Sequence, residues 1–105
     1  MNIKNTKTVW NKPKKENRLK NDELVLFRIF ISEKTMDTCQ ICHKEHIADF
    51  HHLFYGSYGA DKDDRTLIGV CRKCHEWCHK NKHQSQKDYK KVADLNWLEF
   101  KENVI

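Results

Sequence analysis

Four cysteines arranged as two C-x-x-C pairs are the residues whose chemistry is clearest. The first pair is Cys39 and Cys42, and the second is Cys71 and Cys74. Each pair can present two sulfurs to one tetrahedral ion, so the spacing predicts a structural zinc site with four thiolate ligands. The chain has 5 cysteines in all, and Cys78 is left over as either a buried free thiol or a replacement for one of the four ligands.

Histidines stand close to the cysteine pairs in the sequence. His75 and His79 are spaced i and i+4, so on a helix they share one face and can bind a single divalent ion together. The cysteines of the same helix lie about 100° round from them, which lets the helix serve two sites. His51 and His52 are expected on the other wall of a cleft that faces this helix. The remaining histidines are expected to be solvated, namely His43, His46 and His83.

The order of these residues resembles the HNH endonuclease family, in its zinc-stapled variety with a ββα-metal core. The resemblance covers residues 39–79. It implies structural zinc on the four paired cysteines and a second divalent ion for catalysis, for which Mg, Mn, Ni and Zn are all open. The residues that carry the resemblance are Cys39-x-x-Cys42, then His51-His52, then Cys71-x-x-Cys74-His75-x-x-x-His79.

The resemblance also implies a role for each histidine of the site. His51 would be a metal ligand and His52 the general base, while His75 and His79 would complete the metal site. The family has an asparagine where this chain has Thr66. That asparagine pins the hairpin loop and so orients the base, which one threonine hydroxyl can do only in part. The residue types suit phosphodiester cleavage. That reaction needs a base to deprotonate water and a Lewis acid to stabilise the negative charge that develops on the phosphate.

Two functions of different classes follow from these residues. The first is a metal-dependent endonuclease that hydrolyses phosphodiester bonds in DNA, with RNA left open as a substrate. The second is a treble-clef zinc module that binds nucleic acid or protein without cutting, with Thr66 marking lost catalysis. A binding module has no need of histidines at ligand and base positions, which favours the enzyme. A zinc-dependent interaction adaptor is a third alternative, and it would need an exposed apolar patch.

The elements that must position these residues are predicted from periodicity and capping residues. A helix to about Lys34 can be capped by Asn21 and carry Leu24, Phe27 and Ile31 on one face, with a buried strand as the rival. A solvated loop is expected to contain Asp61, Asp63 and Asp64, with a metal contact from one of them as the alternative. The further expectations are a strand over 48–55, a strand over 66–70, a helix from Cys71 to about Lys82, a helix capped by Ser85, and a short helix from Asn96.

Together these elements predict a small α+β fold, with a zinc-stapled treble-clef or ββα-metal core and flanking helices. A single domain would cover 21–105, with its core in 39–82 and C-terminal helices in 85–104. One geometric conflict remains, because neighbours on a regular strand point to opposite faces whereas His51 and His52 must serve one cleft. A bulge or a local strand twist would remove the conflict.

The net charge of +5 is unevenly placed, because residues 1–20 carry +6 and the other 85 residues sum to −1. We expect this segment to be a flexible arm, because it contains Pro13 and almost no apolar periodicity. A basic arm on a near-neutral domain is a common way to hold a polyanion such as DNA, and a solubilising tail is the alternative. The residues assigned to this nucleic-acid arm are Lys4, Lys7, Lys12, Lys14, Lys15, Arg18 and Lys20.

Length and composition limit the class of protein. A chain of 105 residues that is 38% hydrophobic is one small domain whose core needs a staple such as zinc. The N-terminus lacks the apolar stretch of a signal peptide, so reduced thiols in the cytoplasm are expected. No apolar run approaches the roughly 20 residues of a membrane span, so no membrane partner is expected. Small size is typical of phage and mobile-element members of the HNH family.

Overall fold

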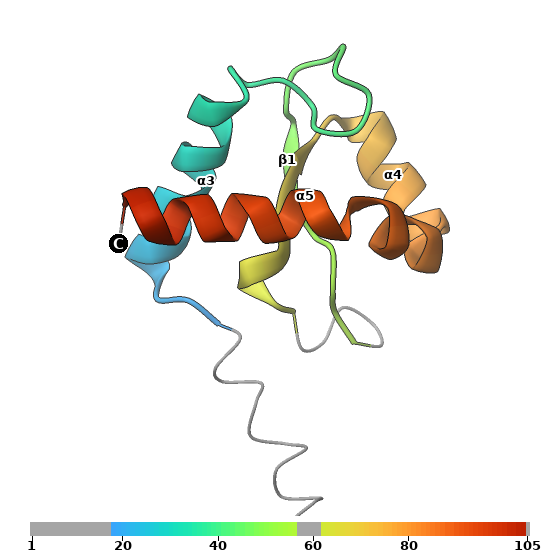
Figure 1. The fold of residues 1–105 in the computed structure, drawn as a ribbon. Coiled ribbons are helices and arrows are strands. Elements are labelled where there is room, and N and C mark those ends of the chain that lie inside the picture. Colours follow the sequence, from blue (N-terminus) through green and yellow to red (C-terminus); the bar gives the residue numbers. More distant parts are fainter. Residues whose placement is uncertain (1–17, 57–61, 105) are drawn as a thin grey trace, which may run out of the picture.

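The histidines of the predicted site lie on and beside a two-stranded antiparallel sheet that three helices flank in the described part of the chain (Figure 1). The protein is therefore a small α+β fold. The structure is a computed structural model that describes residues 18–56 and 62–104. In chain order the elements are α3 (Asn21–Lys34), β1 (Asp49–His52), the 3₁₀ helix η2 (Asp64–Thr66), β2 (Leu67–Val70), α4 (Arg72–Lys80) and α5 (Lys82–Asn103).

Strands β1 and β2 pair in a regular antiparallel register. Asp49 lies opposite Val70 and His52 lies opposite Leu67, with no residue skipped between them. This described pair of strands therefore contains no bulge. Strand β1 stops short of the predicted span 48–55, because the chain opposite its end turns into the 3₁₀ helix η2 instead of continuing as a strand.

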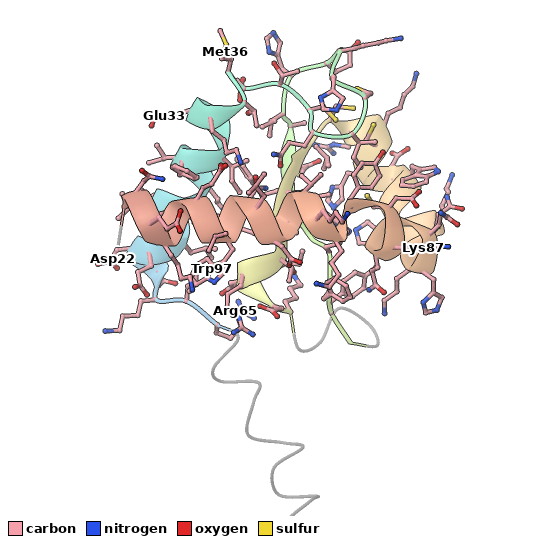
Figure 2. The ribbon with its side chains drawn as sticks, viewed as in Figure 1. Asp22, Glu33, Met36, Arg65, Lys87 and Trp97 are labelled. Atoms are coloured by element: carbon pink, nitrogen blue, oxygen red, sulfur yellow. The ribbon has the colours of Figure 1, made fainter. Side chains whose placement is uncertain are left out.

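Helix α3 is confirmed and the rival strand is wrong, but the N-cap is Lys20 and the predicted cap Asn21 is the first helical residue. Phe27 and Ile31 are fully buried and Phe30 packs against the same cluster, together with Phe100 of α5. A helix brings positions 27, 30 and 31 to one face, whereas a strand would point position 30 away from the other two. The rings of Phe27 and Phe100 lie 4.8 Å apart between centroids. Trp97, which lies below α5 in Figure 2, contacts Phe27 edge-on at 5.5 Å.

Helix α5 is one continuous helix that crosses in front of the sheet and α3 (Figure 1). The predicted division into helices beginning at Ser85 and Asn96 is wrong, because both side chains find partners within the fold instead of capping a helix. The Ser85 hydroxyl is buried and donates to the backbone oxygen of Lys82 (2.8 Å). The Asn96 side chain is fully buried, donates to the backbone oxygen of Leu67 (3.0 Å) and accepts from Gln40 (3.0 Å).

Helix α4 presents the second cysteine pair and two histidines. Cys71 is the residue before its first turn. The helix ends at Lys80, earlier than predicted, because Asn81 takes a non-helical backbone conformation with φ −127° and ψ 57° before α5 begins. Buried Leu53, Ile68 and other apolar residues fill the space between the sheet, α5 and the cysteines. Among the described residues, no helix combines the length and apolar character needed to cross a membrane.

Candidate metal sites and the histidine cavity

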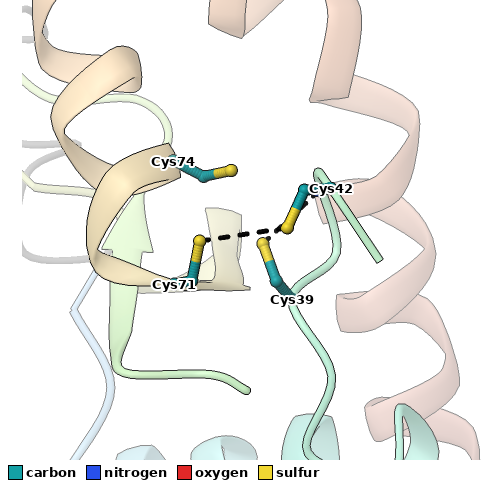
Figure 3. A group of neighbouring side chains, drawn as sticks. All are labelled: Cys39, Cys42, Cys71 and Cys74. Atoms are coloured by element: carbon teal, nitrogen blue, oxygen red, sulfur yellow. Dashed lines mark hydrogen bonds between the residues drawn. The ribbon is translucent and has the colours of Figure 1, made fainter. Parts of the chain in front are cut away.

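The two cysteine pairs come together as predicted, from two separate parts of the chain. Cys39 and Cys42 lie in the loop after α3, whereas Cys71 precedes α4 and Cys74 lies in its first turn (Figure 3). All four sulfur atoms lie within 4.8 Å of one another. The sulfurs of Cys42 and Cys71, one from each pair, are 3.9 Å apart. Four thiols in this arrangement can hold a metal ion.

Backbone N–H groups around the first pair favour negative charge on its sulfurs. The N–H groups of Ile41 and Cys42 point to the Cys39 sulfur at 3.4 and 3.5 Å. Hydrogen bonds from the backbone N–H groups of Glu45 and Lys44 lower the pKa of Cys42 from 9.0 to about 6. A thiolate is the form that binds a metal, so the backbone of this loop favours the metal-binding form of Cys42.

Cys74 of the second pair and the fifth cysteine have the opposite tendency. Burial raises the pKa of Cys74, and contacts with Cys71 and Cys39 raise it further, because crowded thiols cannot all carry charge without a cation among them. Cys78 does not belong to the four-sulfur group. It is fully buried, and burial raises its pKa to about 11 although a hydrogen bond with Ser85 opposes the shift. Of the two alternatives for Cys78, the buried free thiol agrees with the structure.

Three of the predicted ligand histidines converge from β1 and α4. One ring nitrogen each of His51, His75 and His79 lies within 4.8 Å of those of the other two. The Nε2 atoms of His75 and His79 are 3.1 Å apart. His51 is 3% exposed, and its Nε2 has no hydrogen-bond partner among the described residues. A buried nitrogen without a partner costs free energy unless a ligand satisfies it, and these three nitrogens can hold a second metal ion.

Two side chains for which the sequence predicted no role contact the Nδ1 atoms of the two α4 histidines. Asp49 Oδ2 lies 3.1 Å from His75 Nδ1 and also accepts from Arg72 Nε at 3.0 Å. The Tyr55 hydroxyl lies 3.4 Å from His79 Nδ1. Partners of this kind fix the orientation of metal-binding imidazoles and leave Nε2 directed at the ion. Strand alternation gives a signal for Asp49, since it stands two residues before His51 and faces the same way.

The surroundings of His51 and His79 favour the neutral form of each ring. Burial lowers the pKa of His51 from 6.5 to about 3, and the neighbouring His75 and His79 add to the shift. Burial also lowers the pKa of His79, with His75 and Lys62 contributing. Neutral imidazole is the form that binds a metal, so these shifts agree with a ligand role.

His52 is held by a buried carboxylate that the sequence predicts as part of a solvated loop. Its Nε2 lies 2.7 Å from Oδ1 of Asp64, a residue that is 0% exposed. Burial raises the pKa of Asp64, but hydrogen bonds from the Leu19 N–H and His52 and the charge of Arg18 lower it overall. Burial lowers the pKa of His52, and Asp64 opposes that shift. The prediction of a solvated Asp64 is wrong, and the residue forms a buried Asp–His pair.

The last residues of the predicted arm are part of the fold. The Leu19 N–H and the Arg18 Nε both donate to Oδ2 of Asp64, at 2.9 and 3.0 Å. The Leu19 side chain also packs against the apolar cluster between α3 and α5. The boundary between arm and domain therefore lies before Arg18, whereas Lys20 is exposed. The other predicted arm residues lie outside the described part of the chain, namely Lys4, Lys7, Lys12, Lys14 and Lys15.

Thr66 ties together the two sides of the loop that follows β1. Its hydroxyl accepts from the backbone N–H of Phe54 (3.2 Å) and donates to the backbone oxygen of Asp63 (2.7 Å). Asp63 also caps η2 through the backbone N–H of Arg65 (3.0 Å), so it is not merely solvated. Thr66 does not contact His52 through any of these bonds. Asp61 lies outside the described residues.

A cavity of about 640 Å³ opens where β1 and α4 meet. His51 and His52 both line it, although β1 has no bulge, so the conflict predicted for adjacent histidines is absent. No aspartate or glutamate belongs to its lining among the described residues. The rest of the lining is Arg28, Phe50, Tyr55, Lys62, His75 and His79. The remaining histidines are exposed as predicted, namely His43, His46 and His83.

Comparison of the chain with family models, with curated proteins and with solved structures gives no match. The function is therefore inferred from the residues of the site and their geometry.

Proposed function

We propose that the protein is a metal-dependent DNA endonuclease of the HNH type. The observation that carries this proposal is the cavity in which three converging imidazoles meet a fourth histidine that has a buried carboxylate partner. Three converging imidazoles suit a divalent cation, and a separate histidine suits proton transfer near neutral pH. Metal ligation and general-base catalysis are the two functions that phosphodiester hydrolysis requires of a protein site.

The local topology supports a ββα-metal core of the treble-clef kind. The hairpin of β1 and β2 leads directly into α4, and β1 and α4 together supply the three imidazoles. The cysteine pairs join the loop before β1 to the start of α4. We infer that zinc occupies the four-thiolate site, because tetrahedral sulfur coordination is typical of structural zinc.

The three imidazoles fit a divalent ion because His51 Nε2 is buried and unpaired while the facing nitrogens of His75 and His79 converge on the same point. Nitrogen ligands favour Zn or Ni over Mg, and Mn lies between them. When bound, such an ion would stabilise negative charge on the phosphate and on the leaving oxygen.

His52 acts as the general base in this proposal. Its Nε2 is engaged by Asp64, so Nδ1 is the nitrogen that remains to accept a proton from water. The water oxygen then forms a bond to phosphorus, the bond from phosphorus to the leaving sugar oxygen breaks, and that oxygen takes a proton from solvent. Asp64 holds the ring in one orientation and one tautomer, with the proton on Nε2. This assigns to Asp64 the orienting task that the family gives to the asparagine at the position of Thr66.

DNA is the proposed substrate, with RNA open. The basic residues before Arg18 are proposed to contact phosphates, because a run of lysines binds a polyanion irrespective of sequence. Arg18 itself is engaged with Asp64 and is assigned a structural role.

A plasmid-nicking assay with Mg, Mn, Ni and Zn tests the proposal. We expect nicking with at least one of these ions, and we expect His52→Ala to lose it while retaining the second metal ion. A protein that binds DNA but nicks it with none of these ions would contradict the nuclease. In that case the non-catalytic zinc module that binds nucleic acid or protein would be the better description.

A further inference from the structure

Arg28 is a cationic side chain on α3 beside the histidine cavity, and it has no ion-pair partner among the described residues. It lines the cavity together with His51 and His52. Its Nε is buried and makes no hydrogen bond with any described residue. A buried N–H without an acceptor is costly, although the Arg28 side chain as a whole is only half-buried. A carboxylate on the cavity wall would give the Arg28 guanidinium an anionic partner within the fold.

The carboxylates close to the cavity are already engaged elsewhere. Asp49 accepts from Arg72 and contacts His75, while Asp64 accepts from Arg18 and contacts His52. Neither of them lines the cavity, and no other acidic residue does so in the described structure. Arg28 therefore lines a cavity whose described lining contains no anion.

A second cation strengthens this pattern. Lys62, from the segment before η2, lines the same cavity. Two cations on the wall of one cavity attract an anion, and a guanidinium fork matches two oxygens of a phosphate group. The cavity volume of about 640 Å³ leaves room for a phosphate group and the sugars on either side of it.

We propose that Arg28, assisted by Lys62, binds the non-bridging oxygens of the phosphate that is cut. This inference rests on the proposed nuclease function, and it assigns to α3 a direct contact with substrate. Because negative charge on those oxygens grows during attack by water, a fixed donor that meets them stabilises the transition state more than the bound substrate.

Three variants test the proposal in the full chain loaded with metal. Arg28→Gln removes the charge, Arg28→Lys keeps the charge but loses the fork, and Lys87→Gln removes one charge from an exposed position on α5, away from the cavity lining (Figure 2). We expect Arg28→Gln to lower kcat for plasmid nicking about 100-fold, with Arg28→Lys intermediate and Lys87→Gln unchanged. Zinc content and thermal melting of each variant show that it is folded.

Binding of a short DNA duplex at several salt concentrations gives a readout that does not require cleavage. The slope of log K against log salt should be about 0.9 less steep for Arg28→Gln, because one phosphate contact is lost, and should be unchanged for Arg28→Lys. Loss of kcat without a change of slope would overturn the phosphate contact. A change of slope with normal kcat would overturn its assignment to the phosphate that is cut.

The two proposals fail in different ways. A parent protein that binds the duplex without nicking it would remove the nuclease, and the difference in slope between Arg28→Gln and Lys87→Gln would still decide the anion site. If Arg28→Gln matches Lys87→Gln in both kcat and slope while the parent nicks DNA, the nuclease stands and the role of Arg28 is wrong.

Discussion

His51 and His52 are neighbours in the sequence, yet their surroundings assign them different chemistry. His51 is buried with an unpaired Nε2 facing His75 and His79, whereas His52 has its Nε2 on the carboxylate of Asp64. The first arrangement leaves a nitrogen lone pair for a cation. The second fixes a ring so that its other nitrogen can exchange a proton.

Replacing these histidines should therefore produce two kinds of failure. His52→Ala should lower the nicking rate about 100- to 10,000-fold, and added metal should not restore it, because the base itself is missing. His75→Ala should weaken binding of the second ion, so a higher metal concentration should restore part of the rate. Nicking rates measured across a metal titration separate the two, and rescue of His52→Ala by metal would contradict its role as base.

The contact between His52 and Asp64 predicts a further effect on rate. Asp64→Asn keeps the size of the side chain but removes the charge that stabilises His52 in the required tautomer. We expect a loss of about 10- to 100-fold in kcat with little change in KM, as for other residues that orient a reactive group. Asp94→Asn on the exposed face of α5 is the matched control, since it removes the same charge from a surface ion pair with Lys90. Equal kcat in both variants would show that Asp64 serves the fold alone.

Burial of His51 predicts a pH dependence for the protein that carries only structural zinc. The folded-state pKa is about 3 against an ordinary value of 6.5, so between these limits the unfolded chain binds more protons. The free energy of unfolding is therefore highest above pH 6.5 and falls with pH, by up to about 1.4 kcal/mol per unit. Urea unfolding above and below pH 6.5 should show a larger loss for the parent than for His51→Asn. The same loss in both proteins would assign the effect to other groups.

At the scale of elements, the segment that leads into α3 is coupled to the histidine cavity. Arg18 and Leu19 hold Asp64, which holds His52, so the start of the domain and the proposed base form one hydrogen-bonded chain. The same segment joins the basic residues of the predicted arm to the fold. Deletions that end before or after Arg18 and Leu19 should therefore separate DNA binding by the arm from the support of Asp64.

Two deletions test this division. Removing residues 1–17 should weaken DNA binding and flatten its salt dependence, with melting temperature and kcat nearly unchanged, because the anchor on Asp64 remains. Removing residues 1–20 should also lower kcat, since Asp64 loses the donors of Arg18 and Leu19. Binding across salt and nicking at saturating DNA measure both effects. A salt slope unaffected by either deletion would leave the arm as a solubilising tail.

At the scale of the whole molecule, the four-thiolate site joins the loop after α3 to the start of α4. Chelation of its metal should unfold the domain, because a chain of this size has little other core and metal binding supplies folding free energy. We expect close to stoichiometric zinc in the parent, and we expect Cys39→Ser and Cys71→Ser to lose zinc and the cooperative melting transition. Cys78→Ala should keep its zinc, since Cys78 lies outside the four-sulfur group. Zinc retained by the two serine variants would overturn the four-thiolate assignment.

Local spacing in the sequence was enough to identify both groups of metal-ligand candidates and the helices that carry them. C-x-x-C pairs and histidines at i and i+4 have fixed geometry over a few residues, so each pair can be recognised locally. The meeting of the two cysteine pairs, and of His51 with the two α4 histidines, depends on the fold. The α3 helix was predictable for the same reason, because its apolar face repeats with the helical period.

Only the tertiary structure decided which polar residues support those candidates. Asp64 contacts His52 across 12 positions and Arg18 across 46 positions of sequence, and no local pattern distinguishes it from the other aspartates of its loop. The continuity of α5 depends on Asn96, whose partners lie on other elements. Arg28 reaches the cavity because packing of Phe27 fixes the rotation of α3. These contacts join segments far apart in the chain, and their geometry is set by how the elements pack.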